Sequence, residues 1–258
     1  MGIMKKIHLN KRPIVCLTSY SKFYAEIVDK YCDIVLVGDS LGMVYYGDPS
    51  TQSVSLNDMI RHAKSVRSGV KKAIMVVDMP YGTYKNPSFA KKNALRIIKE
   101  TKCDAVKLEG GKEINHIIKH LIKHKINVMG HIGLLPQKVR SRKDYKIKGV
   151  NTVEKNKILN DLKCIQESGV FSIVLEAVKY QTAKEVMRLS KIPIIGIGAS
   201  DKCDGQILVL EDLIGMFEKV PKFVKKYLNL RSCIKKAVKL YSKDIRDKKF
   251  PTKKNFYY

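Results

Sequence analysis

Polar side chains recur at the carboxyl ends of short apolar segments along this chain. They are Asp39 and Ser40, Asp78, Lys107 and Glu109, His131, Glu176, and a glycine-rich turn that ends at Ser200. Each of them alone could be a helix cap or a turn residue. If the apolar segments are parallel strands of one barrel, however, their carboxyl ends meet at a single rim, where active sites of such barrels lie. Six such ends in one chain therefore predict a shared site.

Three of these side chains are carboxylates on successive segments, namely Asp39, Asp78 and Glu109. Mg²⁺ prefers hard oxygen ligands and keeps some water or substrate oxygens in its coordination shell. The three carboxylates therefore predict a Mg²⁺ site that also holds an oxyacid. The alternative is that they are three independent loop caps.

The remaining polar residues suggest how such a site could work. Glu176 follows Ile173-Val-Leu, and a carboxylate beside apolar neighbours has a raised pKa and can act as a general base. Lys107 is two residues from Glu109, so both would share a strand face, and it could neutralise a substrate carboxylate. His131 could donate a hydrogen bond, or it could be a satisfied barrel histidine. A 2-keto acid chelated by Mg²⁺ fits this set: Glu176 would form an enolate that attacks a one-carbon electrophile.

Eight apolar segments would have to position these residues. They are rich in Val and Ile, and their continuous apolar character is typical of strands buried on both faces of a parallel sheet. Helical patterns lie between many of them, for example from a capping box at Ser55 to Gly69 and after Asn86-Pro87. This alternation predicts an α/β fold, a (β/α)8 TIM barrel, with an open doubly wound sheet as the runner-up. The segments are residues 14–17, 33–37, 73–77, 104–108, 127–129, 171–175, 192–197 and 206–210.

Length and charge bound the domain organisation. The 258 residues are expected to form one barrel domain over 1–258, with extra C-terminal helices in a basic segment at about 219–258. The spacing of Phe223, Val224, Tyr227 and Leu228 predicts the first of these helices. The formal net charge of +26 raises nucleic acid as a partner. Yet the basic residues are 41 Lys and only 9 Arg, and readers of bases and phosphates rely heavily on Arg. Residues 219–258 hold 14 basic and 2 acidic residues, away from the strand ends, so we expect no nucleic-acid partner.

The cysteine pattern and the hydropathy indicate the cellular compartment of the protein and whether it spans a membrane. The six cysteines form no C-x-x-C pair and no zinc spacing, which favours a reduced, cytoplasmic location. No apolar stretch approaches 18 residues, so we expect no membrane span.

Several strings in this chain together resemble one enzyme family. The resemblance covers about residues 10–230 and is to ketopantoate hydroxymethyltransferase (3-methyl-2-oxobutanoate hydroxymethyltransferase), within the phosphoenolpyruvate/pyruvate barrel superfamily. The most specific strings are Val37-Gly-Asp-Ser-Leu-Gly-Met43 and Gly130-His-Ile-Gly-Leu-Leu-Pro-Gln137. Others are Val106-Lys-Leu-Glu-Gly-Gly111, Asp144-Tyr-Lys-Ile-Lys-Gly149, Val174-Leu-Glu176 and Ile194-Ile-Gly-Ile-Gly-Ala-Ser200.

The resemblance implies a reaction and a set of roles. In such a reaction 5,10-methylenetetrahydrofolate, 3-methyl-2-oxobutanoate and water give 2-dehydropantoate and tetrahydrofolate, a step of pantothenate and coenzyme A synthesis. It implies a cytoplasmic homo-oligomer, typically a decamer. The matching residues imply Glu176 as the proton acceptor. They also imply Asp39, Asp78 and Glu109 around Mg²⁺, and Asp39, Ser40, Asp78, Lys107 and His131 at the substrate.

Two alternatives stay open beside this reading. One is a related Mg²⁺-dependent 2-oxo acid lyase or mutase, although we find no equivalent of the catalytic Cys loop that such lyases use. The other is a nucleic-acid-binding protein, which rests on charge alone. The chain also departs from the family pattern at three places. Gln52-Ser53 stands where Leu-Pro is common, and Asp144 and Ser200 stand where Gly is frequent.

Overall fold

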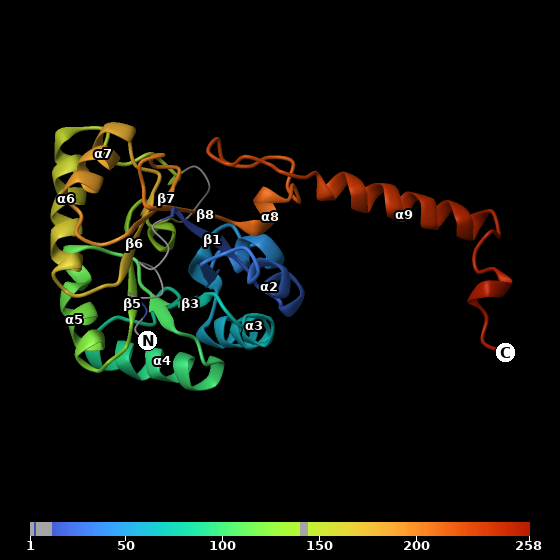
Figure 1. Cartoon of the computed structure of the whole chain (residues 1–258), viewed down its shortest axis with the longest axis horizontal. Helices are drawn as coiled ribbons and strands as arrows, with labels where there is room; N and C mark the ends of the chain where they lie inside the picture. The colour runs from blue at the N-terminus through green and yellow to red at the C-terminus, as the bar shows by residue number, and fades with distance from the viewer. Residues whose placement is uncertain (1–2, 4–11, 140–143) are drawn as a thin grey trace. The chain divides into compact units, whose positions relative to one another are not determined.

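Eight parallel strands close into a barrel in the computed structural model, which describes Ile3, residues 12–139 and residues 144–258 (Figure 1). Each strand pairs with the next along the chain, and β8 pairs with β1. This confirms the predicted barrel and excludes the open sheet. The strands are β1 Ile14–Thr18, β2 Ile34–Val37, β3 Ile74–Asp78, β4 Ala105–Lys107, β5 Val128–Gly133, β6 Ser172–Glu176, β7 Ile194–Ile197 and β8 Gly205–Leu208.

Helices occupy the connections between the strands. The longer ones are α2 Lys22–Val28, α3 Leu56–Gly69, α4 Pro87–Thr101, α5 Asn115–Lys123, α6 Thr152–Gln166 and α7 Tyr180–Leu189. The predicted capping box is present, because the Ser55 side chain accepts from the Asp58 N–H while the Asp58 carboxylate accepts from the Ser55 N–H. Asn86 caps α4, and Pro87 occupies its first turn. Helix α2 had no counterpart among the sequence predictions.

The barrel interior is filled by alternate residues of the strands. Ile14 and Cys16 of β1, and Ile34 and Leu36 of β2, belong to one buried cluster with members from the other strands. In β2 and β3, the residues that point away from the barrel interior are buried as well. They are buried because the helices cover the outer face of the sheet. Burial on both faces explains why these segments read as continuous apolar runs.

Four aspartate side chains accept hydrogen bonds from main-chain N–H groups at the amino-terminal edge of the barrel. The side chains of Asp33, Asp104 and Asp204 each precede a strand and accept a hydrogen bond from a main-chain N–H of the neighbouring strand, at 2.8–2.9 Å. Asp29, at the end of α2, accepts from the N–H groups of Lys72 and Ala73 just before β3. These carboxylates satisfy main-chain donors at the edge opposite the carboxyl-terminal rim, where residues support stability and not catalysis.

Residues 209–258 form a second compact unit of the chain. This unit contains α8 Leu210–Leu213 and the basic helix α9 Leu230–Arg246, which buries none of its own side chains. A helical stripe predicted from Phe223 to Leu228 is wrong, because the Tyr227 N–H bonds to the carbonyl of Leu213 and not to a preceding turn of helix. Within the described part of the chain, no helix has the length and apolar character needed to cross a bilayer.

We expect Asp29→Ala to lower the free energy of unfolding by about 1–3 kcal/mol at pH 7, because it leaves buried main-chain donors without a partner. Burial raises the pKa of Asp29, but the hydrogen bonds from Ala73 and Lys72 outweigh it and hold the pKa below its ordinary value. A lowered folded-state pKa stabilises the fold above the unfolded-state pKa of about 3.9, and this stabilisation is lost as the pH falls through the folded-state pKa. Denaturant unfolding at several pH values measures the effect.

The difference between wild type and Asp29→Ala should therefore shrink below about pH 4. Asp201→Ala, in an exposed turn, is the matched control and should change stability little. A difference that stays constant down to pH 3 would contradict the assigned role of the carboxylate.

Candidate functional site

The predicted polar residues gather at the carboxyl-terminal rim of the barrel. Asp78, Lys107 and Glu176 are the last residues of β3, β4 and β6, and His131 lies within β5. The sheet register sets Asp78 beside Lys107 and Gly133 beside Glu176. Asp39 follows β2 by two residues. The predicted strand-end residues are thus positioned by neighbouring parallel strands.

Lys107 is the buried cation of this rim. Its Nζ lies 2.9 Å from Asp78 Oδ1 and 3.9 Å from Glu109 Oε1, and all three side chains are buried. Burial lowers the pKa of Lys107, but the carboxylates of Asp78, Glu109 and Asp39 outweigh burial and raise the pKa above its ordinary value. Lys107 therefore stays charged inside the barrel.

The surroundings of Asp39 and Asp78 disfavour the ionised form of both carboxylates. The main-chain N–H of Asp39 donates to Asp78 Oδ2 at 3.1 Å. Burial, with Asp78 and Glu109 nearby, raises the pKa of Asp39 well above its ordinary value. Burial also raises the pKa of Asp78, although Lys107 opposes it. Buried carboxylates whose ionised form is disfavoured in this way form a donor set that suits a hard divalent cation.

His131 lies between two carboxylates. Its Nδ1 is 3.5 Å from Glu109 Oε1, and its Nε2 is 3.3 Å from Glu176 Oε2. Both contacts are at ion-pair distance but outside hydrogen-bond geometry, so the attraction is mainly electrostatic. Burial and Lys107 lower the pKa of His131, and the two carboxylates outweigh them and raise it to about 9. The imidazolium in turn lowers the pKa of Glu109 against the effect of its burial.

Glu176 is held at the rim by a close approach of main chains. The carbonyl of Glu176 accepts from the Leu134 N–H at 2.9 Å. Gly133 makes this approach possible, because its φ is +94° and a Cβ there would lie 2.5 Å from the Glu176 carbonyl oxygen. The next residue, Ala177, has a φ of +47°. The Glu176 side chain keeps partial exposure, at 13%, while its His131 neighbour is buried.

Ser40 lies at the edge of the same site. Its Oγ is 2.8 Å from the hydroxyl of the buried Tyr20, which follows β1. A Cβ at Gly38 would meet both Ser40 Oγ, at 2.9 Å, and Asp78 Oδ2, at 3.6 Å. Ser40 and Asp78 therefore approach the same point of the main chain, just after β2. Ser200 lies in the turn after β7, and its described hydrogen bonds reach none of the site carboxylates.

Two residues of the site were not predicted as functional. Gln137 is buried, and its side-chain Nε2 donates to Asp39 Oδ2 at 2.7 Å, while its main-chain N–H donates to Glu109 Oε2 at 3.0 Å. Tyr84 donates its hydroxyl to Gln137 Oε1 and to the Glu109 carbonyl. Gln137 ends a string already noted in the sequence, so a signal existed for it. Nothing in the sequence pattern singles out Tyr84.

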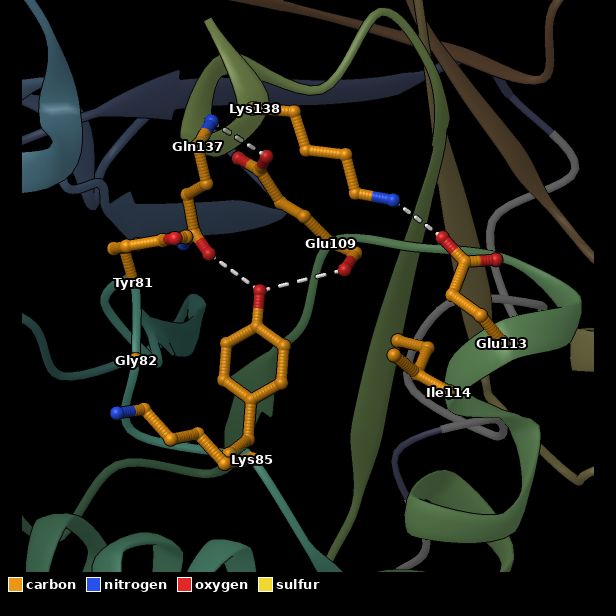
Figure 2. A pocket seen from close by; sticks show the side chains of 9 residues that line it. Tyr81, Gly82, Lys85, Glu109, Glu113, Ile114, Gln137 and Lys138 are labelled. Atoms are coloured by element: carbon orange, nitrogen blue, oxygen red, sulfur yellow. Dashed lines mark hydrogen bonds and ion pairs between the residues drawn. The ribbon is translucent and has the colours of Figure 1, made fainter. Parts of the chain in front are cut away.

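A cavity of about 200 Å³ adjoins the carboxylates on the side of Gln137. Figure 2 shows Glu109 and Gln137 on one side of the cavity. The Lys138 side chain extends toward Glu113, and its Nζ lies 2.5 Å from Glu113 Oε1. The cavity is built by the loops after β3, β4 and β5. Its residues are Tyr81, Gly82, Tyr84, Lys85, Glu109, Glu113, Ile114, Gln137 and Lys138.

The side chains do not, as they stand, converge on one metal position. Among the described residues, no three His, Cys, Asp or Glu side chains are grouped closely enough to hold an ion. Asp78 Oδ1 faces Lys107, and Asp39 Oδ2 faces Gln137. The chemistry of the donors fits a divalent cation, and small side-chain rotations would be needed to present their oxygens to it.

Solved structures of known proteins share this fold. A phosphonopyruvate hydrolase solved with oxalate and Mg²⁺ superimposes with a TM-score of 0.64 over 98% of this chain and 93% of its own, at 10% identity. A 2,3-dimethylmalate lyase of the PEP mutase/isocitrate lyase superfamily gives 0.64 over 99% and 89%, at 12% identity. At such identities these matches show the fold alone, and they agree with the predicted (β/α)8 barrel.

Sequence comparisons are more specific. A 3-methyl-2-oxobutanoate hydroxymethyltransferase of Pelagibacter ubique (strain HTCC1062) is 54% identical over 248 residues, which cover 96% of this chain and 95% of the relative. One from Rhizobium etli is 49% identical over 242 residues, covering 93% and 89%. The model of a family described as ketopantoate hydroxymethyltransferase matches residues 2–253 and so extends past the expected limit near residue 230. Because this match spans nearly the whole sequence, the chain belongs to the ketopantoate hydroxymethyltransferase family.

Proposed function

We propose that this chain transfers a one-carbon unit from 5,10-methylenetetrahydrofolate to 3-methyl-2-oxobutanoate, giving 2-dehydropantoate and tetrahydrofolate. The observation that carries the proposal is the placement of Glu176 at the same rim as the buried Asp39, Asp78, Lys107 and Glu109. The family membership supports the substrate class. The buried carboxylates and the partly exposed Glu176 at the same rim support a bound cation and a base.

The proposed site holds a magnesium ion through Asp39, Asp78 and Glu109. Their buried carboxylates and the raised pKa of the two aspartates support a bound cation. When bound, the ion would supply Lewis-acid chemistry, polarising the keto oxygen of the substrate and stabilising the negative charge that develops there.

The chain's own residues bind the keto acid and move its proton. Lys107, whose ammonium group pairs with Asp78, would attract the substrate carboxylate. Ser40 and His131 would donate hydrogen bonds to the keto acid. The Glu176 carboxylate would accept the proton from C3, the carbon next to the carbonyl. The resulting carbanion would form a C–C bond to the one-carbon unit, whose two bonds to the folate nitrogens break during the transfer. Water would supply the hydroxyl of the new hydroxymethyl group, and the C3 proton and the remaining proton of water would end on the two nitrogens of tetrahydrofolate. His131, held between Glu109 and Glu176, would orient the base.

The alternatives are weaker on the same observations. A 2-oxo acid lyase or mutase shares only the fold, at 10–12% identity. A nucleic-acid partner rests on the charge, and residues 219–258, which hold 14 basic and 2 acidic residues, contain none of the predicted site residues. A cytoplasmic location and a decamer stay predictions.

Purified protein incubated with 3-methyl-2-oxobutanoate, methylenetetrahydrofolate and Mg²⁺ should form ketopantoate, detected by mass spectrometry. Cleavage of 2-oxo acid substrates with no ketopantoate would favour the lyase alternative. A folded protein that forms no ketopantoate would overturn the proposal.

Glu176→Gln should reduce the exchange of the C3 proton of the keto acid with solvent by on the order of 10²–10⁴-fold, because the amide cannot accept the proton. Hydrogen exchange followed by NMR needs no folate, so it isolates the deprotonation step. Glu167→Gln, at the exposed end of α6, is the matched control and should exchange at the wild-type rate. Exchange that continues unchanged in Glu176→Gln would remove this residue from the role of base.

Removing divalent cations with a chelator should slow both exchange and turnover by on the order of 100-fold or more, since loss of a Lewis acid removes several kcal/mol of stabilisation. Adding Mg²⁺ back should restore both rates. Full activity of metal-depleted protein would show that the carboxylates serve another purpose.

A further inference from the structure

Gln137 connects two carboxylates that come from different strands. It lies in the short helix η4 Pro136–Lys138 after β5, and it bonds to Asp39 from β2 and to Glu109 from β4. The contact to Glu109 uses the main chain, at 3.0 Å, and the contact to Asp39 uses the side chain, at 2.7 Å. Both partners are buried. Asp39 and Glu109 lie on separate loops, and the two contacts of Gln137 fix the position of one carboxylate relative to the other.

The orientation of the Gln137 amide is determined by its surroundings. Its Nε2 donates to the carbonyl of Met79, at 3.0 Å, as well as to Asp39. The opposite orientation would direct the amide oxygen at two acceptors. On the other side, the Tyr84 hydroxyl donates to the amide oxygen and also reaches the Glu109 carbonyl.

The main chain of Gln137 is held by a side chain from another loop. Gln52, in η2 Thr51–Ser53, donates its Nε2 to the Gln137 carbonyl at 2.9 Å. This hydrogen bond joins the loop after β5 to the loop after β2, which also carries Asp39.

The neutrality of the amide matters for a cation site. Lys107 pairs with Asp78, and His131 lies against Glu109, so these carboxylates have charged partners. Asp39 instead receives its side-chain hydrogen bond from an uncharged group. An uncharged donor orients a carboxylate without competing with a cation for its negative charge. Partners of this kind around metal ligands are typically needed for tight binding.

We propose that Gln137 is a positioning residue that orients Asp39 and Glu109 for a divalent cation, that Tyr84 fixes the orientation of its amide, and that Gln52 fixes its main chain. This inference rests on the proposed function for the presence of a cation. It assigns to the loops after β2, β3 and β5 a role in metal affinity that is separate from proton removal by Glu176.

The test measures Mg²⁺ binding to the full chain by titration calorimetry, without substrates. Gln137→Met keeps the size of the side chain but removes the three hydrogen bonds of the amide, with Asp39, Met79 and Tyr84, and it should weaken Mg²⁺ binding by about 10–100-fold. Tyr84→Phe should weaken it by a few-fold. The double variant should bind like Gln137→Met alone, because Tyr84 acts through Gln137. Gln52→Leu should have a few-fold effect.

Tyr81→Phe is the matched control, since Tyr81 lines the same cavity and is 54% exposed; it should bind Mg²⁺ like wild type. Melting temperatures of each variant, measured in the presence of chelator, show whether weaker Mg²⁺ binding comes from unfolding. If Gln137→Met does not fold, the Mg²⁺ affinity of Tyr84→Phe provides the test. Wild-type affinity in Tyr84→Phe and Gln137→Met, or additive effects in the double variant, would overturn the inference. Wild-type Mg²⁺ binding without ketopantoate formation would instead overturn the proposed function alone.

Discussion

Three carboxylates buried side by side are the constraint on which the rest of the rim depends. Two unit charges 4 Å apart interact by about 4 kcal/mol at an effective dielectric constant of 20, so Asp39, Asp78 and Glu109 cannot stay ionised together without compensation. Lys107 lies between Asp78 and Glu109, and His131 lies between Glu109 and Glu176. The remaining negative charge is what the proposed divalent cation would neutralise.

The barrel provides this arrangement because its strands are parallel and in register. Asp78 and Lys107 are register partners on adjacent strands, and Glu176 sits beside Gly133 of β5. The aspartates at the opposite edge hold the strands in place through their main chains. Stability and chemistry are therefore separated at the two ends of the barrel, so a substitution at one end is expected to leave the other largely unaffected.

The sequence predicted the eight strands because burial on both faces leaves a continuous apolar signature. It also predicted Asp39, Asp78, Glu109 and Glu176 as site candidates, since each directly follows or ends such a segment. It missed α2 and misread residues 223–228 as helical. The apolar spacing in that segment resembles a helix, but its main chain bonds to residues near Leu213 instead.

The sequence by itself determined the fold class, the family and the residues at the strand ends, because strand burial and local spacing are encoded over a few consecutive residues. Only the tertiary structure decided which charges meet. His131 pairs with Glu109 and Glu176, and Gln137 and Tyr84 form a bridge to Asp39 and Glu109; these contacts join residues 22–98 positions apart. Such contacts depend on how the closed barrel brings its loops together, and no local pattern of residues records that closure.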